Sequence, residues 1–435
     1  MKWCHLKWYA AAVVLLFGPV GLRMLSWERT RLQAVDREMA KSGEELFNHT
    51  WQIKDALSPD GDGLGPVFNA RSCVACHNQG GPGGGGDVEH NVTTYVIQVG
   101  GQKGDPVEQR EGVIHTHATE EQYRETLAHL DPVLPPISQV SLQFLQQVDK
   151  EPGGRLVMRS GMLRGAVPSH IQLSQRNTPA LFGSNLIDSI PERVILANER
   201  AQRVQNGKGT MGRVHRLPDG RVGRFGWKGQ TAHLAEFVQA ACANELGLGN
   251  PGKEQPVSLA DPNYRPGGLD LTQQQCDQLT AFVASLKRPE ERLPAETGLR
   301  FQAQSGKALF SAIGCADCHQ PNLGSVEGIY SDLLLHRMGE SLVGAGRGYN
   351  AEPAPAKTEP TRPPESGPLA EEWRTPPLWG VADSAPYLHD GRAATLEAAI
   401  ELHDGQAAAA AEHFRSLEPV RRTQLLAFLR TLRAP

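Results

Sequence analysis

The 435-residue sequence has little net charge and few aromatic residues. Its 44 Lys and Arg residues nearly balance 48 Asp and Glu residues, for a formal net charge of −4. The charge therefore gives no sign of a nucleic-acid partner. Aromatic residues make up only 6% of the chain, whereas Gly (46) and Pro (31) are plentiful. This composition predicts a loop-rich protein whose chain does not supply the whole of its apolar core.

The N-terminal apolar run, Tyr9 to Val20, is short for a helix that spans a membrane. A Gly-Pro pair interrupts it, and Lys2 and Lys7 precede it, which is the pattern of an export signal. Because no clean small-x-small cleavage site follows, residues 1–27 are either a cleaved signal peptide or an uncleaved membrane anchor. Either alternative places the body of the chain in the periplasm or elsewhere outside the cytoplasm.

Only seven cysteines are present, and four of them belong to two Cys-x-x-Cys-His motifs. Two thiols at this spacing can each add to a vinyl group of one haem, and the histidine then becomes an axial ligand. A single motif is also compatible with half of a zinc site, which needs two further ligands nearby. The second copy favours haem. We therefore expect two covalently attached c-type haems, held by Cys73, Cys76, His77, Cys315, Cys318 and His319.

Two cysteines are left over in the mature region, Cys242 and Cys276. In an exported protein they can form a disulfide, and the alternative is two unpaired buried thiols. Apart from the two haem motifs, the mature chain has no Cys-x-x-Cys. Nothing therefore indicates thiol chemistry.

The turn from Ser58 to Gly63 contains Asp60 and Asp62, which resemble part of a calcium-binding loop. The other ligands of such a loop are missing from this stretch. A plain turn is therefore the better interpretation, and Ca2+ is the weaker alternative.

Hydrophobic periodicity predicts several helices and one strand. The strand is Asn91 to Val99, which is rich in β-branched residues. Helices are expected within residues 28–56 and over 190–204, 231–246, 271–286 and 417–432.

The chain also contains an internal repeat. Gly-x-x-Leu-Phe precedes each haem motif, at Gly43 and at Gly306, and Thr-Pro-x-Leu-x-Gly follows each, at Thr178 and at Thr375. Each half ends in Gln-Leu-x-Ala-Phe-x-x-x-Leu. The repeat predicts a mainly α fold of two cytochrome c-like haem domains, over residues 40–295 and 296–435, with long loops and a small β insertion in the first domain.

The two halves differ at one position that matters for haem chemistry. Aligning Gly391 with Gly229 sets His403, at the end of a helix, opposite Ala241. His403 can bind iron and Ala241 cannot, so the second haem is expected to be closed by His319 and His403. A closed haem transfers electrons, whereas an open one binds a small molecule.

Other interpretations of these histidines stay open. His403 is alternatively a surface residue of its helix. A histidine from elsewhere can also fill the open side of the first haem, and the candidates are His90, His115 and His117.

Five motifs resemble the di-haem cytochrome c peroxidase and MauG superfamily, and most closely its di-haem oxidoreductase branch of peroxidases, sometimes labelled thiol oxidoreductases. The resemblance covers about residues 40–435. The motifs are Asp62 to His77, Arg224 to Gly229, Asp332 to Gly339, Glu372 to Gly380 and Pro386 to Arg392.

The resemblance implies roles for two further residues. The tryptophan that lies between the haems in the peroxidases falls on Trp227, whose alternative role is core packing. The acid that moves protons during peroxide cleavage falls on Glu245, whose alternative is a surface position at a helix end. The distal glutamine of the family is replaced by Phe237, and His403 stands where the family often has Met or Tyr.

Three other residues of the motifs have weaker implications. His336 and His389 are expected at haem propionates or at the domain interface. Arg337 stands where the closer branch often has an acid, and the resemblance gives it no role.

The resemblance implies an exported peroxidase-like enzyme that reduces hydrogen peroxide at the first haem. Its electron donor would be a small redox protein or a quinol-linked carrier, and a homodimer is one expected form. The alternatives are a pure di-haem electron carrier and a MauG-like oxidation of a partner through high-valent haem.

Overall fold

The structure is a computed structural model. It describes residues 36–99, 108–119, 171–204, 210–256, 264–265, 267–344 and 368–435. The expected signal peptide or anchor, residues 1–27, lies outside the described residues. Within them, every helix is too short or too polar to cross a membrane.

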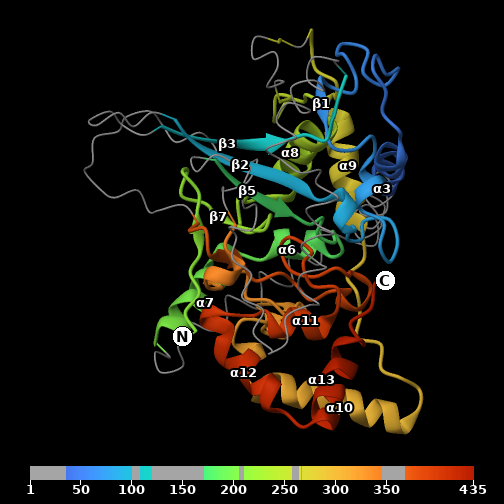
Figure 1. The fold of residues 1–435 in the computed structure, drawn as a ribbon. Coiled ribbons are helices and arrows are strands. Elements are labelled where there is room, and N and C mark those ends of the chain that lie inside the picture. The colour runs from blue at the N-terminus through green and yellow to red at the C-terminus, as the bar shows by residue number, and fades with distance from the viewer. Residues whose placement is uncertain are drawn as a thin grey trace, which may run out of the picture.

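The fold combines helices with small antiparallel sheets (Figure 1). The helices are one over residues 36–48, α3 (Cys73–Cys76), α6 (Ser184–Ser189), α7 (Glu192–Val204), α8 (Leu234–Leu246), α9 (Gln273–Ser285), α10 (Thr297–Ala312), α11 (Leu396–Glu401), α12 (Ala408–Ser416) and α13 (Pro419–Leu429). The strands are β1 (Val67–Phe68), β2 (Val92–Val99), β3 (Glu108–Ile114), β4 (His117–Ala118), β5 (Ile171–Arg176), β6 (His215–Arg216), β7 (Val222–Gly223), β8 (Asn322–Leu323), β9 (Val326–Glu327), β10 (Leu335–Arg337) and β11 (Glu372–Arg374).

The predicted helices and the predicted strand are present in the described residues, with ends that differ by a few positions. The prediction of a mainly α fold is confirmed only in part, because the described residues also form five sheets. In the largest, β2 lies between β3 and β5 and pairs antiparallel with both. This sheet follows the first haem motif in the chain, where a small β insertion was expected.

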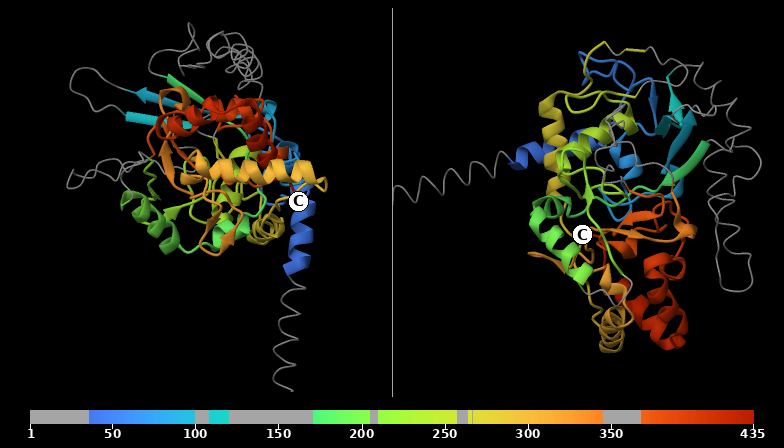
Figure 2. Two further views of the ribbon diagram at one scale, coloured as in Figure 1. Left: turned by 90° about the horizontal axis from the view of Figure 1, so that it is seen from below. Right: turned by 90° about the vertical axis from the view of Figure 1, so that its left-hand side faces the viewer.

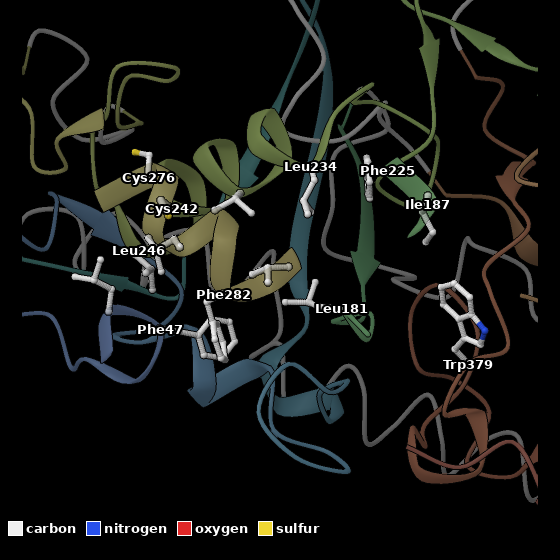
Figure 3. Close-up of a cluster of buried hydrophobic side chains, with 14 of the residues drawn as sticks. Phe47, Leu181, Ile187, Phe225, Leu234, Cys242, Leu246, Cys276, Phe282 and Trp379 are labelled. Atoms are coloured by element: carbon white, nitrogen blue, oxygen red, sulfur yellow. The ribbon is translucent and has the colours of Figure 1, made fainter. Parts of the chain in front are cut away.

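The larger hydrophobic core lies around α8 and α9 (Figure 3). Phe47, from the helix over residues 36–48, packs on Phe282 of α9 with ring centroids 5.0 Å apart. The N-terminal end of that helix projects from the body (Figure 2). This core also takes in Leu334 and Trp379 from the second half of the chain, so the two halves pack against each other.

Local sequence explains where α8 and α9 end and begin. Gly247 follows α8 with φ of +66°, a conformation that costs glycine little. Thr272 caps α9 by accepting a hydrogen bond from the backbone N–H of Gln275, whose side chain accepts from the backbone N–H of Thr272. Such a capping box satisfies two otherwise unpaired donors. Both ends therefore follow common helix-terminating and helix-starting signals.

A second, smaller core lies between α10 and α13, which pack along each other (Figures 1 and 2). Phe310 of α10 contacts Phe428 of α13 with ring centroids 5.4 Å apart. Pro419 begins α13 at the first helical position, where its missing N–H costs nothing. The contact between Phe310 and Phe428 holds the final helix beside the helix that leads into the second haem motif.

The sequence repeat has a direct structural counterpart in two close helix crossings. A Cβ added to Gly43 would lie 1.9 Å from the backbone oxygen of Gln278. A Cβ added to Gly306 would lie 1.9 Å from the backbone oxygen of Gln424. In each half the glycine that precedes the haem motif therefore lets its helix touch the final helix of that half, and no larger residue fits there.

Candidate functional site

The first Cys-x-x-Cys-His motif forms the single helical turn α3 and the residue after it. Ser72 caps this turn by accepting a hydrogen bond from the backbone N–H of Ala75 at 3.2 Å. The Nδ1–H of His77 donates to the backbone oxygen of Gly84 at 3.1 Å, which leaves Nε2 for another partner. Burial lowers the pKa of His77 to about 4, so its ring is neutral, as a metal ligand must be.

The second motif begins with a 3-10 turn over Cys315–Asp317, and its histidine is held in the same way and has a partner histidine. The Nδ1–H of His319 donates to the backbone oxygen of Tyr330 at 3.0 Å, and that of His403 to Ala399 at 2.7 Å. The centroids of the two rings are 6.5 Å apart, and their planes are tilted by 57°. Burial lowers the pKa of both histidines, that of His319 to about 4. His403 lies just beyond α11, which ends at Glu401, so the prediction that this helix runs to His403 was too long.

The geometry of this pair fits two axial ligands of one ion. Two imidazoles on opposite sides of a metal, each with a nitrogen about 2 Å from it, have ring centres about 6.3 Å apart. The observed separation is 6.5 Å. A largely apolar cavity of about 590 Å3 is lined by both rings and by Cys315 and Cys318. Its volume is in the usual range for a cofactor site, about 300–1,000 Å3.

A smaller cavity of about 130 Å3 lies at the first motif. The fit of a haem here rests on the donor set, because the volume is below the usual range of about 300–1,000 Å3 for ligand sites. The structure brings most of the sequence-predicted residues of the first site to this one cavity. They are Cys73, Cys76, His77, Trp227, Phe237, Ala241 and Glu245.

Glu245, near the end of α8, is not the surface residue of the alternative interpretation. Its Oε2 accepts a hydrogen bond from Nδ2 of Asn69 at 2.7 Å. Its Oε1 is buried and has no hydrogen-bond partner among the described residues. Burial raises the pKa of Glu245 to about 7, and the bond from Asn69 acts in the opposite direction. A carboxyl group with this pKa can both accept and release a proton near neutral pH.

Trp227 lines both the smaller and the larger cavity, as does Phe237. The indole Nε1–H of Trp227 donates to the backbone oxygen of Asn177 at 2.8 Å, which fixes the plane of the ring. Trp227 is thus half-buried in the wall between the two candidate haem sites. The bridging role that the resemblance implies for Trp227 stays a prediction.

The three histidines considered for the open side of the first haem lie in different places. His90 lines the smaller cavity, and its Nδ1–H donates to Asp87 at 2.8 Å. His115 is buried and bonds through Nε2 to the backbone oxygen of Asn244, and His117 stacks on Phe68. Within the described residues His90 is the one of the three that lines this cavity.

His336 and His389 are buried and line the larger cavity. His336 forms an ion pair with Asp332, 2.8 Å apart, and this carboxylate raises the histidine pKa well above its ordinary value. Its Nδ1 is 3.6 Å from the sulfur of Cys318, so a buried cation lies beside the second haem motif. Arg337 is exposed, 3.9 Å from Glu371.

Two predictions outside the haem motifs have outcomes in the structure. Cys242 and Cys276 are buried free thiols, so the unpaired alternative holds (Figure 3). Asp62 accepts a hydrogen bond from Gln255 at 2.9 Å, and lies against Asp270, whose pKa is raised to about 7 by burial and by Asp62. Calcium at this turn stays a prediction.

Sequence reasoning missed a cluster of buried basic side chains beside the larger cavity. Nζ of Lys228 donates to three backbone oxygens of residues 369–372 and lies 4.0 Å from the ring centre of Trp373. On Trp373 also stack His389, with centroids 3.7 Å apart, and the guanidinium of Arg176. Lys228, Trp373 and His389 belong to three of the five family motifs. The sequence signal for this cluster was therefore the presence of these residues in motifs that could be expected to meet in the fold.

Comparison with known proteins gives one family and several relatives. Residues 157–432 match the model of the family described as "Di-haem oxidoreductase, putative peroxidase". The gamma subunit of hydrazine synthase from Kuenenia stuttgartiensis is 24% identical over 187 residues, which are 40% of this chain and 50% of that protein. The chain thus spans about half the length of this curated relative.

Two solved structures are also similar. Hydrazine synthase from Kuenenia stuttgartiensis, pressurised with xenon, has a TM-score of 0.33 and 15% identity, and the match covers 76% of this chain and 100% of that one. A MauG-like protein associated with microbial copper homeostasis has a TM-score of 0.29 and 19% identity, with 56% of this chain and 90% of that one covered.

Proposed function

Because the chain belongs to the di-haem oxidoreductase family, we propose that it reduces hydrogen peroxide at its first motif with electrons relayed from its second. Two electrons and two protons convert one molecule of hydrogen peroxide into two of water. The observation that carries this proposal is Glu245, whose buried carboxyl oxygen Oε1 has no partner in the described residues and which lines the same cavity as His77 and Ala241.

Family membership implies haem cofactors, and the two motifs are the proposed places of covalent attachment. Each thiol would add across a vinyl group of a haem, forming a sulfur–carbon bond while the thiol proton goes to the neighbouring carbon. Cys73, Cys76 and His77 would hold the first haem. Cys315 and Cys318 would hold the second between His319 and His403, which is supported by the separation of the two rings.

Glu245 would move the proton during cleavage of the oxygen–oxygen bond. When bound, a haem supplies an iron that can take a peroxide oxygen and exchange single electrons. The carboxylate of Glu245 takes a proton from one peroxide oxygen and returns it to the other, so that water is the leaving group. Phe237 stands where the family has a glutamine, which leaves Glu245 as the proposed polar group for this transfer.

Trp227 would provide the electron path between the two sites. An indole in the wall shared by both cavities shortens the distance that an electron must cross through saturated groups. Its hydrogen bond to Asn177 holds the ring in place, so the path does not depend on side-chain motion.

The wider setting is proposed on the same basis. The chain would be exported, with residues 40–295 and 296–435 as two cytochrome c-like domains. A small redox protein or a quinol-linked carrier would deliver electrons to the second site. Anchoring through residues 1–27 and formation of a homodimer are parts of the proposal that cell fractionation and sedimentation test.

The experiment that tests the proposal is the variant Glu245→Gln. Its peroxide turnover is measured after the variant and its control are each shown to hold two haems. We expect kcat to fall by about 10²–10⁴-fold, the usual contribution of a positioned acid–base group. The matched control is Glu236→Gln on the same helix, because Glu236 is partly exposed and pairs with Arg221. Unchanged turnover in Glu245→Gln, with haem content intact, overturns the role of this residue.

A further inference from the structure

We propose that Asn69 is a positioning residue that holds one carboxyl oxygen of Glu245 and so decides which oxygen exchanges the proton. This inference rests on the proposed function. Asn69 lies four residues before Cys73, in the loop that leads into the first motif. None of the roles derived above includes it.

Three hydrogen bonds join the Asn69 segment to Glu245. The side-chain Nδ2 of Asn69 donates to Oε2 of Glu245 at 2.7 Å. The backbone N–H of Asn69 donates to the backbone oxygen of Glu245 at 2.7 Å, and that of Ala70 donates to the same oxygen at 3.2 Å. The segment therefore fixes both the backbone and the side chain of Glu245.

The orientation of the Asn69 amide is determined by a second set of contacts. Its Oδ1 accepts a hydrogen bond from the backbone N–H of Thr116 at 3.0 Å. Because that N–H can only donate, the oxygen of the amide must face Thr116 and the nitrogen must face Glu245. Thr116 is itself held in place, because it directly precedes β4 as Asn69 directly follows β1, and these strands pair with Phe68 opposite His117.

This fixed donor has a chemical consequence for Glu245. An amide nitrogen cannot accept a proton from a carboxylic acid, so Oε2 must remain an acceptor in both protonation states. When Glu245 is protonated, the proton is therefore on Oε1, the oxygen without a partner in the described residues. Asn69 thus assigns the acceptor role to one oxygen and the proton-transfer role to the other.

The surroundings of Glu245 favour this assignment. The other titratable or charged side chains of the same cavity are Cys73, Cys76, His77, His90, Arg176 and Cys242. Asn69 donates a hydrogen bond directly to the Glu245 carboxyl group. Removing the Asn69 donor withdraws an interaction that favours the charged form, so the carboxyl group is expected to hold its proton to higher pH.

The test uses the holoenzyme and the variant Asn69→Asp. This change keeps the side-chain oxygen that accepts the hydrogen bond from Thr116 and replaces only the amide nitrogen that donates to Glu245. The contact between this loop and Thr116 is therefore expected to remain. We expect the pH limb of peroxide turnover to move up by about one unit or more, with about tenfold lower turnover at pH 7. The matched control is Asn48→Asp, because the Asn48 amide bonds to a backbone oxygen of an exposed helix. It should leave both quantities unchanged.

Two further measurements separate positioning from a merely structural role. The infrared carboxylic C=O band that Glu245→Gln removes should titrate at higher pH in Asn69→Asp, and this readout needs no turnover. In the Glu245→Gln background, Asn69→Asp should cause no further loss, because it acts through Glu245. If Asn69→Asp does not load haem, Asn69→Ala carries the same comparisons.

The outcomes distinguish this inference from the proposed function. An unmoved pH limb and an unmoved infrared band in active protein overturn the role of Asn69 and leave the proposed function standing. A band that shifts in a protein without peroxide turnover supports the role of Asn69 and overturns the proposed function. Equal losses from Asn69→Asp with and without Glu245 overturn the positioning role.

Discussion

His319 and His403 both line the larger cavity, with ring centroids 6.5 Å apart. Each ring donates its Nδ1–H to a backbone oxygen, which leaves its Nε2 for another partner. The equivalent position in the first half is Ala241, which lines the cavity of His77. We therefore propose that the two haem sites serve different tasks, one closed by two histidines and one with room for a small molecule.

Replacing His403 by Ala should open the second site without releasing the haem, because the two cysteines still hold it. The expected result is loss of the low-spin absorption of that haem and its return when imidazole is added. His233→Ala is the control, since His233 is exposed and its Nδ1 lies 3.3 Å from a carboxylate oxygen of Asp188. A spectrum that does not change in His403→Ala contradicts this assignment.

Replacing Trp227 by Phe should slow electron transfer between the two sites by about an order of magnitude or more. The fold should persist, because the lost hydrogen bond to Asn177 is worth only about 0.5–1.5 kcal/mol. Stopped-flow reduction of the first haem through the second measures the rate. Trp379→Phe serves as the control, because Trp379 lines only the larger of the two cavities. Equal rates in all three proteins exclude Trp227 from the path.

The pH dependence of peroxide turnover should follow the carboxyl group of Glu245. Burial raises its pKa to about 7, so below that pH the group is neutral and cannot take a proton from peroxide. We expect kcat/KM to rise about tenfold per pH unit below pH 7 and to level off above it. This limb should vanish in Glu245→Gln. A limb that persists in the variant belongs to another group.

Asp270 should make the protein less stable as the pH rises. Its folded pKa of about 7 lies above the ordinary value of 3.8, because burial and Asp62 oppose its charge. The stability linked to this proton is present below about pH 4 and is lost as the pH rises through about 7. Between these values the wild type should lose about 2–4 kcal/mol of unfolding free energy that Asp270→Asn does not lose. Parallel urea titrations at several pH values measure the difference.

The wild type and Asp270→Asn together also test the calcium prediction. A cation between Asp62 and Asp270 would neutralise both carboxylates and raise Tm at about pH 8 in the wild type but not in Asp270→Asn. Identical Tm values in the presence of Ca2+ and of a chelator contradict a calcium site at this turn.

The sequence was sufficient for features that depend on local spacing. The haem motifs, the capped helix at Thr272 and the strand that became β2 could each be predicted from a short window. The internal repeat allowed a further prediction, because it aligned equivalent positions in the two halves of the chain. It led to Ala241 and His403, which line the two cavities as the comparison requires.

Features that depend on contacts across the fold could not be predicted in this way. Asn69 and Glu245 are 176 residues apart, and nothing in either segment indicates that they meet. Whether Cys242 and Cys276 pair depends on how α8 packs on α9, which the sequence left open. The end of α11 was misplaced because its periodicity continues past Glu401, whereas the chain turns before His403.

The central claim is that one haem is open and the other is closed by two histidines. The measurement that tests it most directly is the resonance Raman spectrum of the oxidised wild-type protein with both haems bound. We predict one high-spin haem at His77 and one low-spin haem at His319 and His403. Two low-spin haems, as would result if His90 or another residue closed the first site, would contradict the claim and leave the protein an electron carrier.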